Sequence, residues 1–258
     1  MTPLLEARGV NKTFSGIIAL DDVSLEVHSG ERVGLIGPNG AGKTTLFNCM
    51  LGMIPLNGGI VSFDGRDLAG LPTYKRVKLG IARTFQRIEL FGGSTVRDHL
   101  LIAERVRSGT GALWKDLLGR GRPTKSEIAT CDAMLELLGL GGLGDEPIEA
   151  LSLGKGRLVE VGRALMTRPS LLMLDEPSSG LDRSETANLA STLRAVQEEQ
   201  GFAILLVEHD VELVSNFTDR CYVLEFGQLI ASGTTADVMV NDRVREAYLG
   251  LPTQKEEK

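Results

Sequence analysis

The first part of the chain has the residue pattern of β-strands interrupted by one helix. From Leu5 to Ile36 the pattern is strand-like, and in VSLEV at 23–27 apolar and polar positions alternate, the period of a half-buried strand. Gly30 marks a turn before the apolar run RVGLI. A helix is predicted directly afterwards, from Gly42 through TTLFNCMLG, and strand character returns at GGIVSFDG.

The middle of the chain, residues 87–150, has a helical pattern instead. Thr95 with Asp98, and Thr124 with Glu127, each have the spacing of a helix capping box ahead of apolar positions. We therefore expect one helix to begin after each of these two threonines.

After Leu151 the pattern becomes an alternation of helices and apolar strands. The strands are LLMLD at 171–175, AILLVEH at 203–209 and CYVLEFG at 221–227, and one of the helices is predicted from Asp182. This alternation is typical of a parallel α/β sheet.

These patterns divide the chain into a core and an inserted helical part. We expect residues 1–86 and 151–250 to form the core and residues 87–150 to form a smaller helical subdomain. Within that subdomain the glycine-rich segment 108–123 is expected to be a loop or a short surface element. Residues 251–258 form a polar tail that we expect to be frayed.

Composition excludes several classes of protein. The 258 residues carry a formal net charge of -6, so the chain has no broad basic field for a nucleic-acid backbone, and we expect no nucleic-acid partner. The cysteines Cys49, Cys131 and Cys221 are scattered without a C-x-x-C, which predicts reduced, buried thiols in a cytosol. No apolar run approaches the roughly 18 residues of a membrane span, so we expect a soluble protein that can dock on a membrane partner.

A phosphate-binding motif follows the apolar run RVGLI. Residues Gly37 to Thr45 read GPNGAGKTT and match G-x-x-x-x-G-K-[ST] between a predicted strand and a predicted helix. Glycines let backbone N–H groups converge on phosphate oxygens, and the helix start adds partial positive charge. Lys43 is expected to neutralise the β- and γ-phosphates of ATP, and Thr44 to coordinate Mg²⁺. A purely structural glycine turn is the alternative, which the flanking strand and helix disfavour.

The residues of this motif that we expect to contact the nucleotide are Gly37, Pro38, Asn39, Gly40, Ala41, Gly42, Lys43, Thr44 and Thr45.

Two adjacent carboxylates end a buried strand further along the chain. In LLMLDEP, Asp175 can enter the metal shell while Glu176 points at the γ-phosphate. Taken alone, such a pair at a strand end is usually a solvated loop, but the phosphate-binding motif upstream reverses that expectation.

His209 and Gln86 are candidates for sensing the γ-phosphate. His209 ends the strand AILLVEH, and functional groups of a parallel sheet collect at the carboxyl ends of its strands. Gln86 lies where the first core segment gives way to the helical part, where it could sense the γ-phosphate or the attacking water. An exposed loop histidine and a surface glutamine are the respective alternatives.

A second candidate phosphate site lies at the start of the helix after Leu151. Leu158, Val161 and Leu165 share one face of this amphipathic helix, and residues 151–154 form its beginning. An ordinary capped helix is the alternative.

Taken together and in this order, these residues resemble the ATP-binding cassette (ABC) ATPases over nearly the whole chain. The resemblance implies an α/β fold in which a P-loop NTPase core, a mixed sheet with an antiparallel β flank, carries a smaller helical subdomain. It implies these motifs: Walker A at 37–45, the Q-loop at Gln86, the signature at 151–155, Walker B at 171–176, the D-loop at 178–182 and the switch histidine at His209.

The resemblance also implies roles for single residues. The catalytic roles fall to Lys43, Gln86, Glu176 and His209, and the metal contacts to Thr44, Gln86 and Asp175. Phe14 stands where the family places an aromatic ring against adenine; without the family, a core phenylalanine is an equal alternative.

The signature departs from the usual LSGGQ. Leu153 replaces the first glycine and Lys155 replaces the glutamine, whereas Ser152 and Gly154 are retained and are expected to contact nucleotide.

Within the family, GIARTFQRIELF, the helical insertion and the ending EAYLG resemble the ATPases of branched-chain amino-acid importers. This implies ATP hydrolysis on the cytoplasmic face of the inner or plasma membrane, with transmembrane permease subunits as partners. It also implies a head-to-tail dimer with a second ATPase subunit, either the same chain or a paralogue. A soluble ABC ATPase outside transport and a low-turnover nucleotide-binding adaptor remain alternatives, and the solute is not specified.

Overall fold

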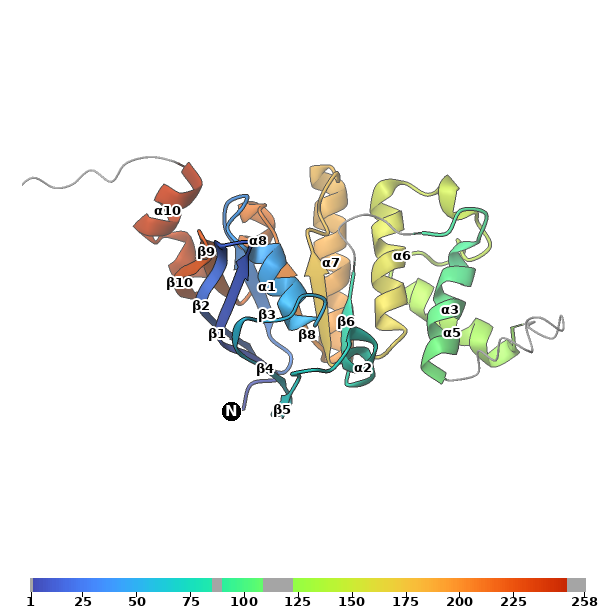
Figure 1. The fold of residues 1–258 in the computed structure, drawn as a ribbon. Coiled ribbons are helices and arrows are strands. Elements are labelled where there is room, and N and C mark those ends of the chain that lie inside the picture. The colour runs from blue at the N-terminus through green and yellow to red at the C-terminus, as the bar shows by residue number, and fades with distance from the viewer. Residues whose placement is uncertain (1, 85–89, 109–122, 250–258) are drawn as a thin grey trace, which may run out of the picture.

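The computed structural model describes residues 2–84, 90–108 and 123–249, which form two sheets and a group of flanking helices (Figure 1). The strands are β1 (Leu5–Phe14), β2 (Ile17–Val27), β3 (Arg32–Ile36), β4 (Gly58–Phe63), β5 (Arg66–Asp67), β6 (Ile81–Arg83), β7 (Leu171–Asp175), β8 (Ala203–Val207), β9 (Arg220–Glu225) and β10 (Gln228–Thr234). The helices are α1 (Lys43–Met50), α2 (Thr73–Lys78), α3 (Val96–Ser108), α5 (Lys125–Leu137), the 3₁₀ turn η1 (Ile148–Ala150), α6 (Leu153–Leu165), α7 (Arg183–Gln200), α8 (Val211–Phe217), α9 (Thr235–Met239) and α10 (Asp242–Leu249).

The central sheet has six strands in the order β10-β9-β3-β8-β7-β6. Neighbouring strands from β9 to β6 run parallel, and β10 pairs antiparallel with β9. A separate antiparallel sheet has the order β2-β1-β4-β5. The mixed sheet with an antiparallel flank is therefore confirmed.

The inner strands β3, β7, β8 and β9 of the central sheet are buried on both faces, which explains their continuous apolar runs. Along β7, Leu172 and Leu174 face one core, which also contains residues of α3, α5, α6, α7 and α8, while Leu171 and Met173 face the other core, with α1 and the antiparallel sheet. Because successive side chains of a strand point to opposite faces of the sheet, the apolar residues of β7 contribute to both cores.

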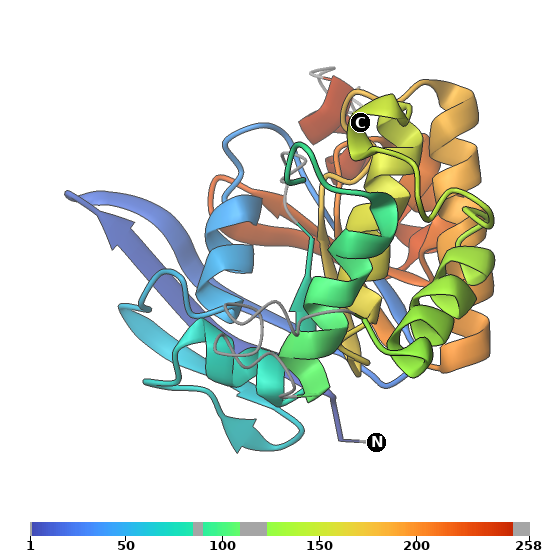
Figure 2. The ribbon, with the colours of Figure 1, turned by 90° about the vertical axis from the view of Figure 1, so that its right-hand side faces the viewer.

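Helices α3 and α5 lie on one side of the molecule, where α3 packs on both α5 and α6 (Figures 1 and 2). Both expected capping pairs are present. The Thr124 hydroxyl accepts the Glu127 N–H at 3.2 Å and the Glu127 carboxylate accepts the Thr124 N–H at 2.7 Å. The corresponding distances for Thr95 and Asp98 are 3.2 and 3.0 Å.

The edge strand β10 and the helix α10 were not expected from sequence. A two-residue turn, Phe226-Gly227, joins β9 to β10, and both residues have positive φ, 45° and 79°. Asn or Asp usually precedes glycine in such a turn, so a phenylalanine there left no recognisable hairpin signal.

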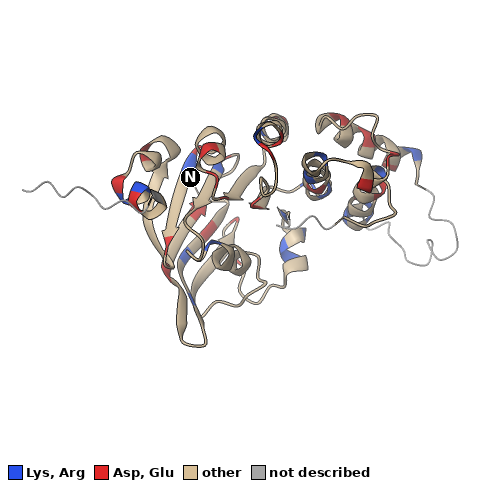
Figure 3. Cartoon of the chain, turned by 90° about the horizontal axis from the view of Figure 1, so that it is seen from above, with Lys and Arg blue, Asp and Glu red and all other residues tan. Residues whose placement is uncertain are grey.

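The three cysteines are free and buried, as expected. None of the helices in the described part of the chain is long and apolar enough to cross a membrane. Basic and acidic residues are interspersed over the described part of the chain (Figure 3). The predicted loop 108–123 falls almost entirely, and the polar tail wholly, outside the described residues.

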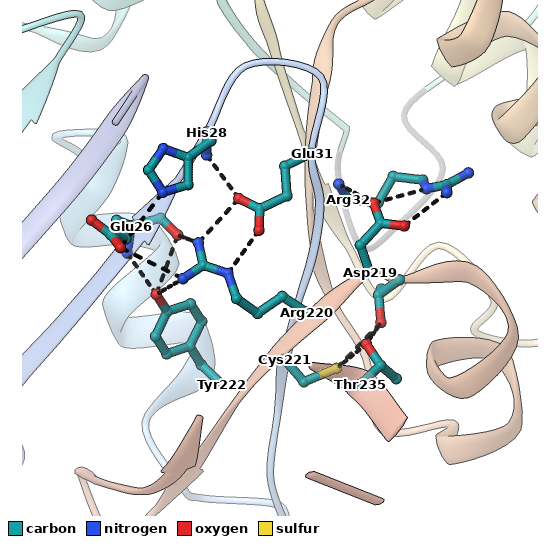
Figure 4. Close-up of polar contacts among 10 residues, drawn as sticks. Glu26, His28, Glu31, Arg32, Asp219, Arg220, Cys221, Tyr222 and Thr235 are labelled. Carbon is teal, nitrogen blue, oxygen red and sulfur yellow. Dashed lines mark hydrogen bonds and ion pairs between the residues drawn. The ribbon is translucent and has the colours of Figure 1, made fainter. Parts of the chain in front are cut away.

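An ion-paired cluster joins the two sheets at the end of β3 away from the phosphate-binding loop (Figure 4). The Arg220 guanidinium, on β9, donates to the Glu31 carboxylate at 2.7 and 3.0 Å and to the Glu26 carbonyl at 2.8 Å. It also donates to the Tyr222 hydroxyl at 2.9 Å. Arg220 therefore fixes the end of β2 and the start of β3 against β9.

Arg220→Ala should lower the free energy of unfolding by about 2 kcal/mol, because it leaves partly buried charged and polar acceptors without their donor. Arg8→Ala is the matched control, since Arg8 pairs with Glu6 at 2.8 Å but has 67% of its side chain exposed. The control should leave the denaturant midpoint nearly unchanged. Equal small shifts for both variants in chemical denaturation would contradict a structural role for the Arg220 cluster.

Candidate nucleotide-binding site

The phosphate-binding loop joins β3 to α1 and has room only for glycine at two positions. Gly37 has φ 151° and a Cβ there would lie 2.0 Å from the Leu224 carbonyl oxygen. Gly42 has φ 103° and a Cβ there would lie 2.7 Å from the Ala19 carbonyl oxygen. Both the backbone conformation and the close approach of neighbouring backbone require glycine.

The first turn of α1 presents its N–H groups without a competing side chain. Gly42 occupies the N-cap position with no side-chain cap, and the first turn holds no acidic residue. Unpaired amides and the helix dipole at such an end favour an anion, and this geometry fits a phosphate chain.

Lys43 is buried at the start of α1, where its ammonium donates to the carbonyls of Gly37 at 2.7 Å and Pro38 at 3.1 Å. Burial lowers the pKa of Lys43, while the nearby carboxylates of Glu176, Asp175 and Glu208 oppose that shift. The ammonium is thus held by the loop itself, close to where the helix amides would receive phosphate.

A hollow of about 430 Å³ opens over the loop. It is lined by residues 39–45, residues 17–19, Glu176, and the turn residues Phe226 and Gly227. One side of the hollow therefore offers backbone amides and Lys43, and another offers apolar side chains. Sequence reasoning missed the apolar lining from Ile17, Ile18 and Phe226, which are remote from any motif.

Phe14 is not among the residues that line this hollow. It ends β1, is 43% exposed, and has the Lys12 ammonium 4.9 Å from its ring centroid. The alternative of a core phenylalanine is wrong, and the contact of Phe14 with adenine stays a prediction.

The structure brings Asp175, Glu176 and His209 together at the carboxyl ends of β7 and β8, which pair in parallel. Glu176 has φ 45°, a conformation uncommon outside glycine, and its Oε1 lies 3.9 Å from His209 Nδ1. Burial raises the pKa of Asp175, and the neighbouring Glu176 raises it further, whereas Arg83 and Lys43 lower it. His209 is exposed but lies beside a carboxylate, unlike an isolated loop histidine.

Glu208, next to His209, was not singled out from sequence. It is fully buried and accepts hydrogen bonds from Ser178 and from the His209 backbone. Its apolar-strand context gave no indication of these partners.

Tyr248 of α10 was also missed. Its phenolic oxygen accepts the Gly37 N–H at 2.6 Å, across 211 positions in the sequence. The C-terminal helix therefore contacts the phosphate-binding loop directly.

The second predicted phosphate site, at the start of α6, lies apart from this hollow. Ser152 is the N-cap and its hydroxyl accepts the Lys155 N–H at 3.4 Å. The Gly154 N–H donates to Glu185 of α7 at 3.2 Å, and Leu153 is exposed. Figure 1 shows α6 and α1 well separated, and Ser152 and Gly154 are not among the residues that line the hollow over the phosphate-binding loop. Gln86 lies outside the described residues.

A central strand that leads through a glycine loop into a helix, with two carboxylates ending the strand β7, defines a P-loop nucleotide-binding protein. Comparison with known proteins narrows the class. Residues 20–179 match the family model described as ABC transporter, and residues 228–250 match the model described as Branched-chain amino acid ATP-binding cassette transporter. The chain belongs to the ATP-binding protein family of ABC transporters, as its motifs predicted.

Curated relatives match over almost their whole length. The High-affinity branched-chain amino acid transport ATP-binding protein LivG of Salmonella typhimurium is 39% identical over 251 residues, 96% of this chain and 98% of LivG. The corresponding protein BraF of Pseudomonas aeruginosa is 37% identical with the same coverage.

Solved structures of ATP-binding cassettes have the same fold as this chain. The ADP conformation of MJ1267, an ATP-binding cassette of an ABC transporter, has a TM-score of 0.85 at 32% identity and covers 97% of this chain and 100% of that chain. A nucleotide-free ATP-binding cassette from an ABC transporter has a TM-score of 0.83 at 30% identity, with the same coverage. The fold class is confirmed, and the family binds nucleotide.

The Tyr248 contact has a consequence for alkaline stability. Burial raises the pKa of Tyr248 to about 12, above the ordinary value of about 10. Between these values the unfolded chain loses the phenolic proton while the folded chain keeps it, so stability falls as pH rises through about 10 to 12.

Tyr248→Phe removes the phenol whose pKa is raised on folding. The free energy of unfolding should therefore fall less steeply above pH 10 than in the wild type. The difference in slope should be on the order of 1 kcal/mol per pH unit, measured by denaturant titration at pH 9, 10 and 11. Parallel slopes would show that the phenol does not titrate differently on folding.

Proposed function

We propose that this chain hydrolyses Mg²⁺-ATP to ADP and phosphate and thereby powers the import of branched-chain amino acids through separate transmembrane permease subunits. The observation that carries the proposal is the placement of Glu176 in the same hollow as the phosphate-binding loop, with His209 beside it. The transport role, as against a soluble ABC ATPase outside transport, is supported by the names of the LivG and BraF relatives.

The side chains at the phosphate-binding loop and at the end of β7 are suited to bind a nucleotide together with Mg²⁺. Among the described residues there is no cluster of three or more His, Cys, Asp or Glu side chains that could hold a metal by itself. Mg²⁺ in phosphate-binding sites typically takes few protein ligands and completes its shell with substrate phosphates and waters. Thr44 and Asp175 are the proposed protein ligands, with Gln86 as a third, and the ion would supply charge neutralisation at the phosphates.

In the proposed reaction, the loop amides and Lys43 hold the β- and γ-phosphates and stabilise the charge that develops on them. Glu176 accepts a proton from the attacking water as the bond to the γ-phosphorus forms, and the bond to the ADP oxygen breaks. His209, close to Glu176, contacts the γ-phosphate, and Gln86 keeps the role of positioning water or metal.

A docking surface for a permease subunit is proposed on an apolar groove of about 320 Å³ between α2, β6, α3 and α6. Val77, Ile102 and Val106 line it and are 38%, 45% and 75% exposed. Exposed apolar side chains gathered in a groove are typical of an interaction site, and the groove flanks β6, the strand that leads toward Gln86.

Glu176→Gln should slow hydrolysis by roughly 10² to 10⁴-fold, because the general base is lost, while ATP affinity stays nearly intact. Lys43→Ala is the contrasting variant and should weaken both ATP binding and hydrolysis, because it removes the buried ammonium from the phosphate site. Phosphate release and isothermal calorimetry measure the two effects.

Near-normal turnover in Glu176→Gln would remove Glu176 from the mechanism, and unchanged ATP affinity in Lys43→Ala would contradict the phosphate-site assignment. If the wild-type chain releases no phosphate even with its membrane partner, the low-turnover adaptor is the correct alternative.

We also propose a head-to-tail dimer in which Ser152 and Gly154 of one chain face the nucleotide of the other. The separation of α6 from α1 within one chain supports this, since a helix start that binds phosphate must then act on a nucleotide bound elsewhere. The partner is a second copy or a paralogous cassette.

In the Glu176→Gln background, ATP should drive dimerisation that light scattering can measure, and ADP should not. Adding Ser152→Glu should abolish the dimer by repulsion between carboxylate and phosphate while monomeric ATP binding persists. A double variant that dimerises as tightly as its parent would refute the sandwich for this chain.

A further inference from the structure

Glu208 is a buried carboxylate that joins two loops of the nucleotide site. It directly follows β8 and is 0% exposed. Its Oε1 accepts both the Ser178 N–H at 2.9 Å and the Ser178 O–H at 2.6 Å. Its Oε2 accepts the His209 N–H at 3.1 Å and lies 3.7 Å from His209 Nδ1.

The two loops that Glu208 joins carry the two groups proposed for hydrolysis. Ser178 lies two positions after Glu176, in a turn closed by the Ser179 N–H donating to the Glu176 carbonyl at 3.1 Å. The Glu176 N–H in turn donates to the Val207 carbonyl, directly before Glu208, at 2.9 Å. Glu176 is thus held through its backbone N–H and carbonyl, and the His209 N–H is held by the Glu208 carboxylate.

We infer that Glu208 is a positioning residue that sets the distance between Glu176 and His209. The inference rests on the proposed function, in which these two side chains act on the water and the γ-phosphate. Glu208 itself, buried behind the two loops, does not line the hollow and acts through them.

The three hydrogen-bond donors around Glu208 require a carboxylate at this position, and another polar side chain of similar size would not replace it. Burying a charge costs free energy unless hydrogen bonds compensate it, and here three donors converge on two oxygens. A glutamine has one acceptor oxygen and an NH₂ group, so it would turn a donor toward either Ser178 or His209. One loop would then move away, even though the side chain keeps its size.

Glu208→Gln should lower kcat by about tenfold to a hundredfold, the loss that a misplacement near 1 Å can cause, while the Kd for ATP stays within about twofold because the phosphate-binding loop is untouched. Ser178→Ala removes one of the three hydrogen bonds and should lower kcat less. The double variant should lose less than the product of the two single losses, since both act on one contact.

Asp210→Asn is the matched control. Asp210 lies two positions further on and also accepts two backbone N–H groups, those of Glu212 at 2.9 Å and Leu213 at 3.1 Å, but both belong to its own helix α8. Because asparagine caps a helix about as well as aspartate, kcat should remain that of the wild type.

A second readout separates positioning from a merely structural role. In the Glu176→Gln background, adding Glu208→Gln should lower the residual turnover by less than it lowers the wild-type kcat, because one of the two groups that Glu208 positions is already lost. A further fall there as large as the one in the wild-type background, or a parallel loss of ATP affinity, would overturn the inference.

Wild-type kcat in Glu208→Gln, with an active wild type, would also overturn it. An inactive wild type would instead refute the proposed hydrolysis and the positioning role together. If Glu208→Gln fails to fold, Ser178→Ala decides alone, and an unchanged kcat in that variant overturns the inference.

Discussion

The carbonyl oxygens of Leu224 and Ala19 lie so close to the phosphate-binding loop that a single extra carbon at Gly37 or Gly42 would collide with them. These carbonyls belong to β9 and β2, so the loop is pressed between the central sheet and the antiparallel sheet. The shape of the loop therefore depends on how the two sheets are held together. At the other end of β3, the hydrogen bonds of Arg220 to Glu31 and to the Glu26 carbonyl connect the two sheets. Because the loop is already ordered before phosphate binds, less conformational entropy is lost on binding.

Charge balance is the second constraint on the site. Three carboxylates, those of Asp175, Glu176 and Glu208, act on the single ammonium of Lys43. A bound nucleotide would add further negative charge, and a divalent cation held by Thr44 and Asp175, as proposed above, would offset it. The negative charge of Glu208, which is buried behind the two loops, is compensated by three hydrogen bonds.

Features that depend on neighbouring positions in the chain could be predicted from sequence. The capping pairs, the strand 171–175 and the glycine loop are examples, since each arises from contacts a few residues apart. Glu208 and Tyr248 could not be predicted, because their partners, Ser178 and Gly37, lie 30 and 211 positions away. Ile17, Ile18 and Phe226 line the hollow only because two hairpins fold toward the loop. The roles of Phe14, Ser152 and Gln86 remain predictions.

The contact of Tyr248 with Gly37 also bears on how the protein is made. A ribosome releases the phosphate-binding loop early, but the hydroxyl that holds the first glycine of that loop is on the last described helix, 211 positions later. Since a chain emerges from the amino terminus onward during synthesis, the loop stays without this contact until α10 has emerged. In the nascent protein this hydrogen bond to the loop can therefore form only after α10 has been synthesised.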